Sequence, residues 1–189
     1  MIDNDLSLVQ PLLMAGAIEV YDNAFDPDSA LFRRLMDSET WERAKVGTDN
    51  VVSEVRTSSN YFLSLSSLSN PVDVFMFGRT LYAYLNDYGK RYDVAFAGIE
   101  DVCINRYEPG QSYRKHSDAG PGYNRVISAL VYLNDVASGG ETVFTLFDEA
   151  VTPRAGRLVI FPSNYAYAHE ARPPAMGIKY SLAAWAVSL

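Results

Sequence analysis

The sequence predicts a mainly β protein, a sandwich or barrel with helices packed outside it. Helical periodicity is found in the first half of the chain, whereas short strand-like runs separated by turn residues follow from about residue 99. This order of elements is typical of a β-sheet core braced by helices. The 189 residues contain no internal repeat, low-complexity segment or linker-like run, so we expect a single domain over residues 1–189.

Two helices are predicted before residue 98. The first begins near Asp26, which can act as the cap of a helix with proline at its first position, and runs to about Ala44. The second opens in the same way at Asn70, and its apolar residues recur at intervals of three or four until Gly89 ends it. The polar stretch over residues 47–70 is expected to connect the two helices as a loop.

The second half of the chain contains strand-like segments separated by turns rich in glycine and proline. These segments span residues 101–107, 125–134, 142–147, 157–162, 165–169 and 178–188. Residues 126–133 are apolar at both parities, so we expect this strand to be covered on both faces. Aromatic residues make up 13% of the chain, which also suits a β-rich protein.

The amino-acid composition indicates which kinds of binding partner are unsuited to this protein. The net charge of −7 argues against nucleic acid or an anionic membrane as the main partner, because both require a basic surface. No run of apolar residues approaches the length of a membrane span, and the acidic N-terminus is unlike a secretory signal. Cys103 is the only cysteine, which excludes an intrachain disulfide and a multi-cysteine metal site. We therefore expect a soluble, cytoplasmic protein.

The chain has two histidines, and both belong to a candidate metal site. His116 and Asp118 are two residues apart, so in extended chain their side chains point to the same side. Alone this spacing is a weak signal, because a surface histidine in a glycine-rich loop would look the same. His169 lies downstream in a strand-like stretch, and two histidines with one carboxylate form the ligand set of non-haem Fe(II) oxygenases.

Lys179 is a candidate anion-binding residue. It begins a strand-like run in which Lys179, Ser181, Ala183 and Trp185 share one face. A lysine that pointed inward without an anion would be costly, and a bound dicarboxylate would supply the missing partner. The local pattern leaves the alternative open, a solvated lysine on an edge strand.

Three ordered stretches, each with its spacing intact, resemble the catalytic region of prolyl 4-hydroxylases. They are Tyr107-x-x-Gly110-Gln111-x-Tyr113-x-x-His116-x-Asp118, then Gly139-Gly140-Glu141-Thr142-x-Phe144, and the segment from His169 through Gly177 and Lys179 to Trp185. The resemblance covers residues 101–187 and extends weakly to Arg56-Thr57-Ser58.

This resemblance implies a double-stranded β-helix, a jelly-roll barrel over about residues 99–189, with helical support over about residues 1–98. It implies that His116, Asp118 and His169 are the catalytic Fe(II) ligands. It also implies that Lys179 binds the distal carboxylate of 2-oxoglutarate, with hydrogen bonds from Tyr107 and Thr142. The positions that match the family's peptide site are Arg56, Ser58, Tyr113, Arg125 and Trp185. For Arg125 a structural salt bridge remains an alternative, and for Trp185 a place in the core.

The activity implied by the resemblance is that of a 2-oxoglutarate- and Fe(II)-dependent dioxygenase. Such an enzyme uses O2 to hydroxylate a prolyl residue in a peptide or protein, releases succinate and CO2, and has ascorbate as a candidate reductant. Two alternatives stay open: hydroxylation of a free amino acid or other small molecule, and a catalytically silent metal-binding interaction module. Tyr180 replaces a tryptophan that is usual in the family, and Thr145 a common proline. These departures put the substrate in doubt rather than the cofactor.

Overall fold

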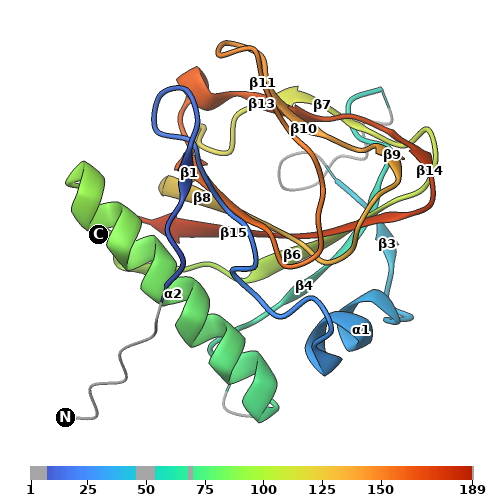
Figure 1. Ribbon diagram of the computed structural model, residues 1–189, viewed down its shortest axis with the longest axis horizontal. Coiled ribbons are helices and arrows are strands. Elements are labelled where there is room, and N and C mark those ends of the chain that lie inside the picture. The colour runs from blue at the N-terminus through green and yellow to red at the C-terminus, as the bar shows by residue number, and fades with distance from the viewer. Residues whose placement is uncertain (1–7, 46–53, 68–69, 189) are drawn as a thin grey trace.

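The computed structural model describes residues 8–45, 54–67 and 70–188. Within these residues the strands form three antiparallel sheets, of which the largest has nine strands (Figure 1). In order across that sheet, eight of its strands are β1 (Leu12–Leu13), β2 (Glu19–Tyr21), β12 (Leu158–Pro162), β8 (Arg125–Tyr132), β15 (Lys179–Val187), β6 (Val102–Tyr107), β4 (Ser59–Leu63) and β3 (Glu42–Arg43). The ninth strand, β5 (Gly98–Ile99), pairs with the end of β15.

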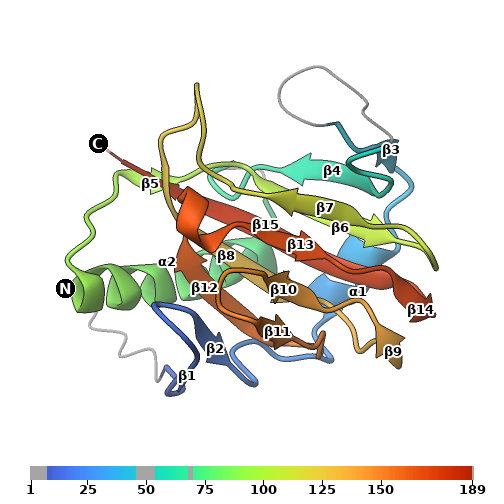
Figure 2. The same cartoon turned by 90° about the horizontal axis from the view of Figure 1, so that it is seen from above.

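A smaller sheet lies across the large one and closes the barrel (Figure 2). Its four strands in order are β11 (Glu149–Val151), β10 (Thr142–Phe144), β13 (His169–Ala171) and β7 (Tyr113–His116). A separate pair consists of β9 (Ser138–Gly139) and β14 (Pro174–Met176). The mainly β fold expected from the sequence is confirmed, with the jelly-roll arrangement of two facing antiparallel sheets.

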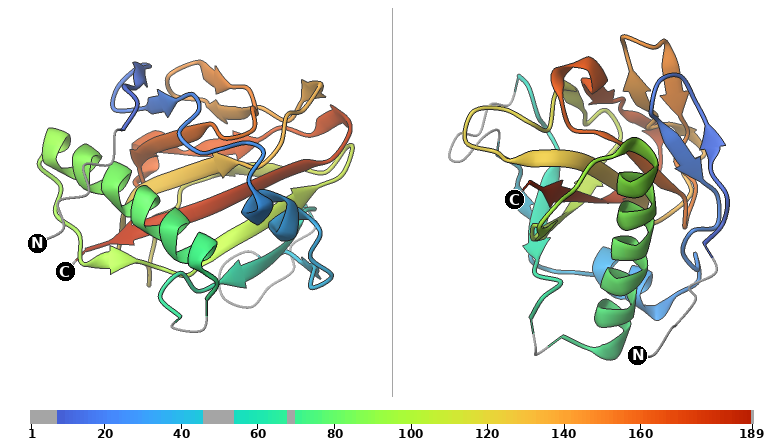
Figure 3. Two further views of the ribbon diagram at one scale, coloured as in Figure 1. Left: turned by 60° about the horizontal axis from the view of Figure 1, so that its bottom comes forward. Right: turned by 90° about the vertical axis from the view of Figure 1, so that its left-hand side faces the viewer.

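Helices α1 (Ala30–Met36) and α2 (Val72–Tyr92) lie on the outer face of the large sheet, away from the smaller one (Figure 3). The inward face of α2 repeats apolar residues every three or four positions, including Phe77 and Leu81. These side chains join Leu182 and neighbouring sheet residues in one hydrophobic core. No helix in the described ranges is long and apolar enough to cross a lipid bilayer.

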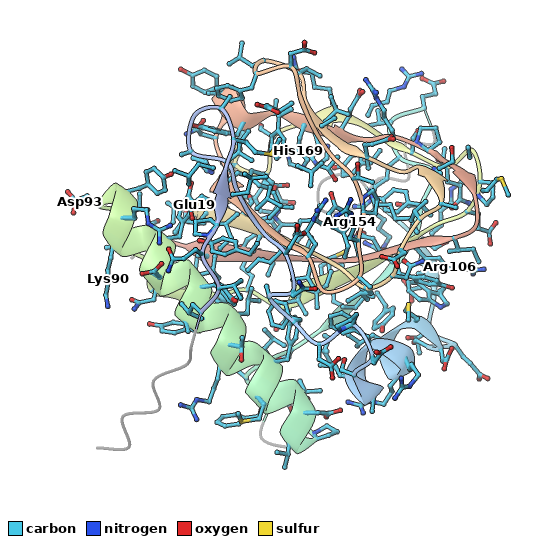
Figure 4. All side chains as sticks on the ribbon, in the orientation of Figure 1. Glu19, Lys90, Asp93, Arg106, Arg154 and His169 are labelled. Atoms are coloured by element: carbon cyan, nitrogen blue, oxygen red, sulfur yellow. The ribbon has the colours of Figure 1, made fainter. Side chains whose placement is uncertain are left out.

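A buried ionic cluster attaches α2 to β2. Glu19 is fully buried, and the Nη1 atom of Arg91 donates to its two carboxylate oxygens at 2.7 and 2.6 Å. The Tyr21 hydroxyl also donates to Glu19. Figure 4 shows Glu19 beside the C-terminal half of α2. Because a buried carboxylate requires its partners, this cluster sets the position of the helix on the sheet.

The first helix is shorter than the sequence predicted. Ser29, rather than Asp26, caps α1 by accepting a hydrogen bond from the N–H of Phe32 at 3.2 Å. The helix ends at Met36 instead of near Ala44, because β3 pairs with β4 in the segment that follows. Sheet pairing therefore overrides the helical pattern beyond the first two turns.

Gly89 does not end α2, which continues to Tyr92 and ends at Asp93 in the left-handed conformation, with φ of 56°. A Cβ on Gly89 would lie only 2.5 Å from the carbonyl oxygen of Val94, so the glycine permits the close return of the chain.

The other differences concern short segments. The expected loop over residues 47–70 contains β4, and its residues 47–53 and 68–69 lie outside the described residues. The strand expected at residues 165–169 begins instead with a short 3-10 helix (Tyr165–Tyr167), capped by the side chain of Asn164, before β13 starts at His169.

Candidate active site

The candidate metal ligands come together between β7 and β13 of the smaller sheet. His116 at the end of β7 and His169 at the start of β13 are directly opposed partners in antiparallel register. Directly opposed residues in such a pair project from the same face of the sheet. Asp118 follows in the loop after β7, and the donor atoms of all three side chains lie within 4.8 Å of one another. His169 is labelled in Figure 4, between the two sheets.

Both imidazoles are oriented by backbone carbonyls. Nδ1 of His116 lies 2.9 Å from the oxygen of Arg114, and Nδ1 of His169 lies 3.1 Å from the oxygen of Tyr167. A carbonyl oxygen only accepts, so each Nδ1 carries the proton and each Nε2 presents a lone pair toward Asp118. These Nε2 atoms lie 3.7 and 4.0 Å from the two carboxylate oxygens of Asp118.

The protonation states of His116 and Asp118 at pH 7 also favour metal binding. Burial, helped by the neighbouring His169, lowers the pKa of His116 to about 3, so this ring is neutral at pH 7. Burial would raise the pKa of Asp118, but the two imidazoles and the Ser128 hydroxyl outweigh it and hold that pKa below its usual value. Neutral imidazole and ionised carboxylate are the forms that bind a metal ion. The arrangement therefore fits a divalent metal with ligand bonds of about 2 Å.

Two serines that the sequence analysis missed hold the carboxylate of Asp118. Ser128 on β8 donates to Oδ2 of Asp118 at 2.7 Å, and the Oγ atoms of Ser128 and Ser163 lie 2.8 Å apart. Both serines are about 1% exposed. Ser128 lies inside the otherwise apolar strand β8 and Ser163 directly follows β12, but the sequence does not show which group either serine meets.

Lys179 points into the barrel and has no carboxylate partner among the described residues. It is 1% exposed, and its Nζ donates to the carbonyl oxygen of Gly140 at 2.6 Å. Burial lowers the pKa of Lys179 to about 7, although Glu141 acts in the opposite direction. The buried amine has only one neutral acceptor, so a bound carboxylate would supply the charged partner that it lacks. The solvated edge-strand alternative is therefore wrong.

The walls around Lys179 are aromatic. Its Nζ lies 5.3 Å from the ring centre of Tyr107 and 5.4 Å from that of Tyr132. Thr142 is buried, and its hydroxyl accepts a hydrogen bond from Tyr132 at 2.8 Å. Tyr132 was missed because it lies in an apolar strand and resembles a core residue.

Arg56, Tyr113 and His116 form a stack that leads away from the metal ligands. The Tyr113 ring lies 3.6 Å from the ring of His116 and is nearly parallel to it, and the guanidinium carbon of Arg56 lies 4.5 Å above Tyr113. Ser58 is fully buried and is absent from the cavity wall. It accepts a hydrogen bond from Nε of Arg56 at 3.1 Å, so it holds Arg56 rather than facing a ligand.

Arg125 forms the structural salt bridge that the sequence left open as an alternative, and it also lines the cavity. It forms an ion pair with Glu100, Nη2 to Oε2 at 2.8 Å, and its guanidinium carbon lies 3.7 Å above the ring of Trp185. Both residues line the cavity. The indole N–H of Trp185 is buried and has no hydrogen-bond partner among the described residues.

One cavity of about 990 Å³ unites these groups. The predicted site residues in its wall are His116, Asp118, His169, Lys179, Tyr107, Thr142, Arg56, Tyr113, Arg125 and Trp185. Its size suits a small dicarboxylate together with part of a second molecule. Among the predicted site residues, Ser58 alone is not part of the wall.

Comparison with known proteins agrees with this geometry. Residues 102–187 match the family model described as the 2OG-Fe(II) oxygenase superfamily. Among curated proteins, a putative prolyl 4-hydroxylase of Acanthamoeba polyphaga mimivirus is 29% identical over 84 residues, which cover 38% of this chain and 35% of that protein. The chain thus spans about a third of that relative's length.

Solved structures with a similar fold cover nearly the whole chain. A prolyl-4-hydroxylase of Pseudomonas putida has a TM-score of 0.74 at 20% identity and covers 93% of this chain and 94% of its own. A Trichoplax adhaerens prolyl hydroxylase, in complex with a hypoxia inducible factor peptide fragment, has a TM-score of 0.74 at 17% identity and covers 92% and 84%. Residues 102–187 are therefore similar to the 2OG-Fe(II) oxygenase superfamily, and the chain has the fold of the prolyl hydroxylases.

Proposed function

We propose that this protein is a 2-oxoglutarate- and Fe(II)-dependent dioxygenase that hydroxylates a prolyl residue in a peptide or protein. The observation that carries the proposal is the buried, uncompensated Lys179 in the same cavity as His116, Asp118 and His169. A silent metal-binding module would have no need for a buried amine in that wall, because the amine destabilises the fold without an anion. The superfamily match supports the same cofactors.

Different residues of the cavity wall would bind the metal and the cosubstrate. His116, Asp118 and His169 would hold Fe(II), and Lys179 would bind the distal carboxylate of 2-oxoglutarate by a charge-assisted hydrogen bond. When bound, iron and 2-oxoglutarate supply the oxidising chemistry with O2. The enclosing walls, including Tyr107, exclude bulk water and keep the reactants in place.

Peptide hydroxylation is favoured over a small-molecule reaction by the shape of the site and by the relatives. Beyond the metal ligands, the cavity wall includes Tyr113, Arg56 and Trp185, and its volume of about 990 Å³ leaves room for more than a single small substrate. The Trichoplax adhaerens relative is described in complex with a peptide fragment. We also propose a cytoplasmic location, because the single cysteine of the chain is buried and unpaired.

An anaerobic titration tests the cofactors. Fe(II) and 2-oxoglutarate are added to the metal-free protein, and the weak visible charge-transfer band of a chelated 2-oxo acid is followed. We expect the band in the wild-type protein and its loss in His169→Ala. A folded, iron-loaded protein that never develops the band would rule out the proposed cosubstrate.

A turnover assay then tests the reaction. With O2, ascorbate and a panel of proline-containing peptides, we expect succinate formation coupled to a mass gain of one oxygen atom on the peptide. The same gain on free amino acids, with none on peptides, would favour the small-molecule alternative.

A further inference from the structure

The cavity wall is basic, although the chain as a whole is acidic. The chain carries a net charge of −7. The charged residues in the cavity wall are five cations, Arg43, Lys45, Arg56, Arg125 and Lys179, and two carboxylates, Glu42 and Asp118. This local excess of positive charge attracts anions into the cavity against the overall field of the protein.

Four of these cations have an explanation. Arg125 is neutralised by Glu100 in an ion pair. Lys179 is the proposed partner of 2-oxoglutarate. If Fe(II), Asp118, Lys179 and doubly charged 2-oxoglutarate are counted together, their charges cancel. Arg43 is exposed, as is Lys45, so water and salt screen both of them. Arg56 is the cation that remains.

Arg56 is buried among neutral groups. It is 9% exposed, and its guanidinium donates to the Ser58 hydroxyl, to the carbonyl oxygen of Lys45 at 3.3 Å and to the side-chain oxygen of Asn105. Among the described residues, no carboxylate forms an ion pair with it. A buried guanidinium in this situation is costly unless an anion joins it.

The other neighbours of Arg56 do not supply that anion. Burial raises the pKa of the Cys103 thiol and those of the Tyr107 and Tyr113 hydroxyls, so all three groups are neutral at pH 7. The described residues that contact Arg56 thus offer hydrogen-bond acceptors and aromatic faces but no negative charge.

The positive charge of Arg56 lies close to the proposed metal site. The guanidinium lies over one face of the Tyr113 ring, and the ring of His116 is stacked with that same tyrosine. Arg56 is therefore one aromatic ring away from a proposed metal ligand. An anion bound there would belong to a molecule that reaches the metal centre.

We propose that Arg56 binds a carboxylate of the substrate, and that the enzyme prefers substrates with a carboxylate close to the carbon that is hydroxylated. This proposal rests on the proposed function, since it assigns a chemical class to the substrate of the same site. Three sources share this chemistry: the C-terminus of a peptide that ends in proline, an acidic side chain beside the proline, and the carboxylate of a free amino acid.

Matched ligand pairs that differ only in charge test the proposal. They are acetyl-glycyl-proline against its C-terminal amide, a blocked tripeptide with Glu against Gln beside proline, and L-proline against prolinamide. Affinities are measured by calorimetry with anaerobic Fe(II)·2-oxoglutarate protein and, separately, with metal-free protein. In at least one pair we expect the acid to bind about ten- to a hundredfold more tightly than the amide.

Variants of Arg56 assign the preference to this residue. Arg56→Gln is expected to reduce the acid-to-amide ratio to about one while the 2-oxoglutarate band and its titration midpoint stay unchanged. Arg56→Lys keeps the charge, so it retains part of the preference and serves if the glutamine variant folds poorly. Arg34→Gln, an exposed arginine on α1, is the matched control and leaves the ratio unchanged.

Three results would overturn the proposal: equal binding of acid and amide in every pair, a ratio that survives in Arg56→Gln, or a raised 2-oxoglutarate requirement in that variant. The last result would assign Arg56 to the cosubstrate instead. Failure of the proposed function has a different signature, because the band would then be absent while calorimetry on metal-free protein still measures the acid preference.

Discussion

The two faces of strand β15 in the large sheet are both largely buried but differ in chemistry. Along β15, Leu182 and Ala184 face the helices and belong to the hydrophobic core. The alternate residues Lys179 and Ser181 are just as inaccessible to solvent, yet they line the cavity. Strand β6 repeats the contrast, since Val102 and Ile104 belong to the same hydrophobic core whereas Cys103 and Asn105 line the cavity. The helix-facing side of these two strands therefore stabilises the fold, whereas their cavity side carries polar groups whose burial opposes stability until ligands arrive.

Burial alone therefore does not identify a residue of the hydrophobic core in this barrel. Lys179 is 1% exposed and Leu182 is 0% exposed. Replacement of one should change ligand binding, and replacement of the other should change the free energy of unfolding. Substitutions on each face test whether the two properties are separable.

The largest effect is expected for Asp118→Ala on the cavity face. Loss of the carboxylate leaves two imidazoles, which bind Fe(II) too weakly for turnover, so succinate formation should fall below detection. Far-ultraviolet circular dichroism should show an unchanged fold. The exposed Asp101→Ala is the control and should retain activity. Measurable turnover in Asp118→Ala would remove this residue from the ligand set.

Leu182→Ala tests the helix-facing side. Truncation of this fully buried side chain should lower the free energy of unfolding by about 2–5 kcal/mol, measured by urea denaturation. The 2-oxoglutarate affinity of the protein that remains folded should change little. Ser181→Ala, its neighbour on the cavity face, should cost far less stability. Similar losses of stability in both variants would contradict the division between the faces.

Lys179→Met should weaken 2-oxoglutarate binding but raise the free energy of unfolding of the ligand-free protein, whereas most substitutions of buried residues lower it. The affinity for 2-oxoglutarate should fall at least thirtyfold, from about 2 kcal/mol or more of lost charge pairing. In the absence of ligand, the variant should be more stable than wild type, because a buried amine has been removed. The exposed Lys90→Met on α2 should change neither property.

The pH dependence of that stabilisation provides a second test. The pKa of Lys179 is lowered from 10.5 to about 7 in the folded protein, so between these values the unfolded chain binds more protons. The stability of the ligand-free wild type should therefore rise with pH across this window. The advantage of Lys179→Met should be greatest below pH 7 and should shrink toward pH 10.5. A pH-independent difference would show that Lys179 is not desolvated.

Ser128→Ala should have the smallest of these effects. Without the hydroxyl, Asp118 loses a charge-assisted hydrogen bond, and metal affinity should fall about ten- to a hundredfold, measured by calorimetry with Mn²⁺. The exposed Ser138→Ala should bind the metal normally. Unchanged affinity in Ser128→Ala would mean that the carboxylate is held by its backbone alone.

Much of the site could be predicted from the sequence because its information is local. Alternation along residues 179–185 placed Lys179, Ser181 and Trp185 on one face, and the strand geometry bears this out. The His-x-Asp spacing and the second histidine indicated the ligand types. Helix boundaries were less accurate, because pairing of β3 with β4 overrides the helical pattern after Met36.

The sequence by itself determined the ligand chemistry, the class of barrel and the parity of its strands. Only the tertiary structure decided that His169 lies opposite His116, that Ser128 holds Asp118, and that Arg56 is buried with no carboxylate partner among the described residues. The physical reason is that parity and propensity are properties of neighbouring residues. The partners of a buried charge are instead fixed by the register of strands that are distant in the chain, and backbone pairing with core packing sets that register.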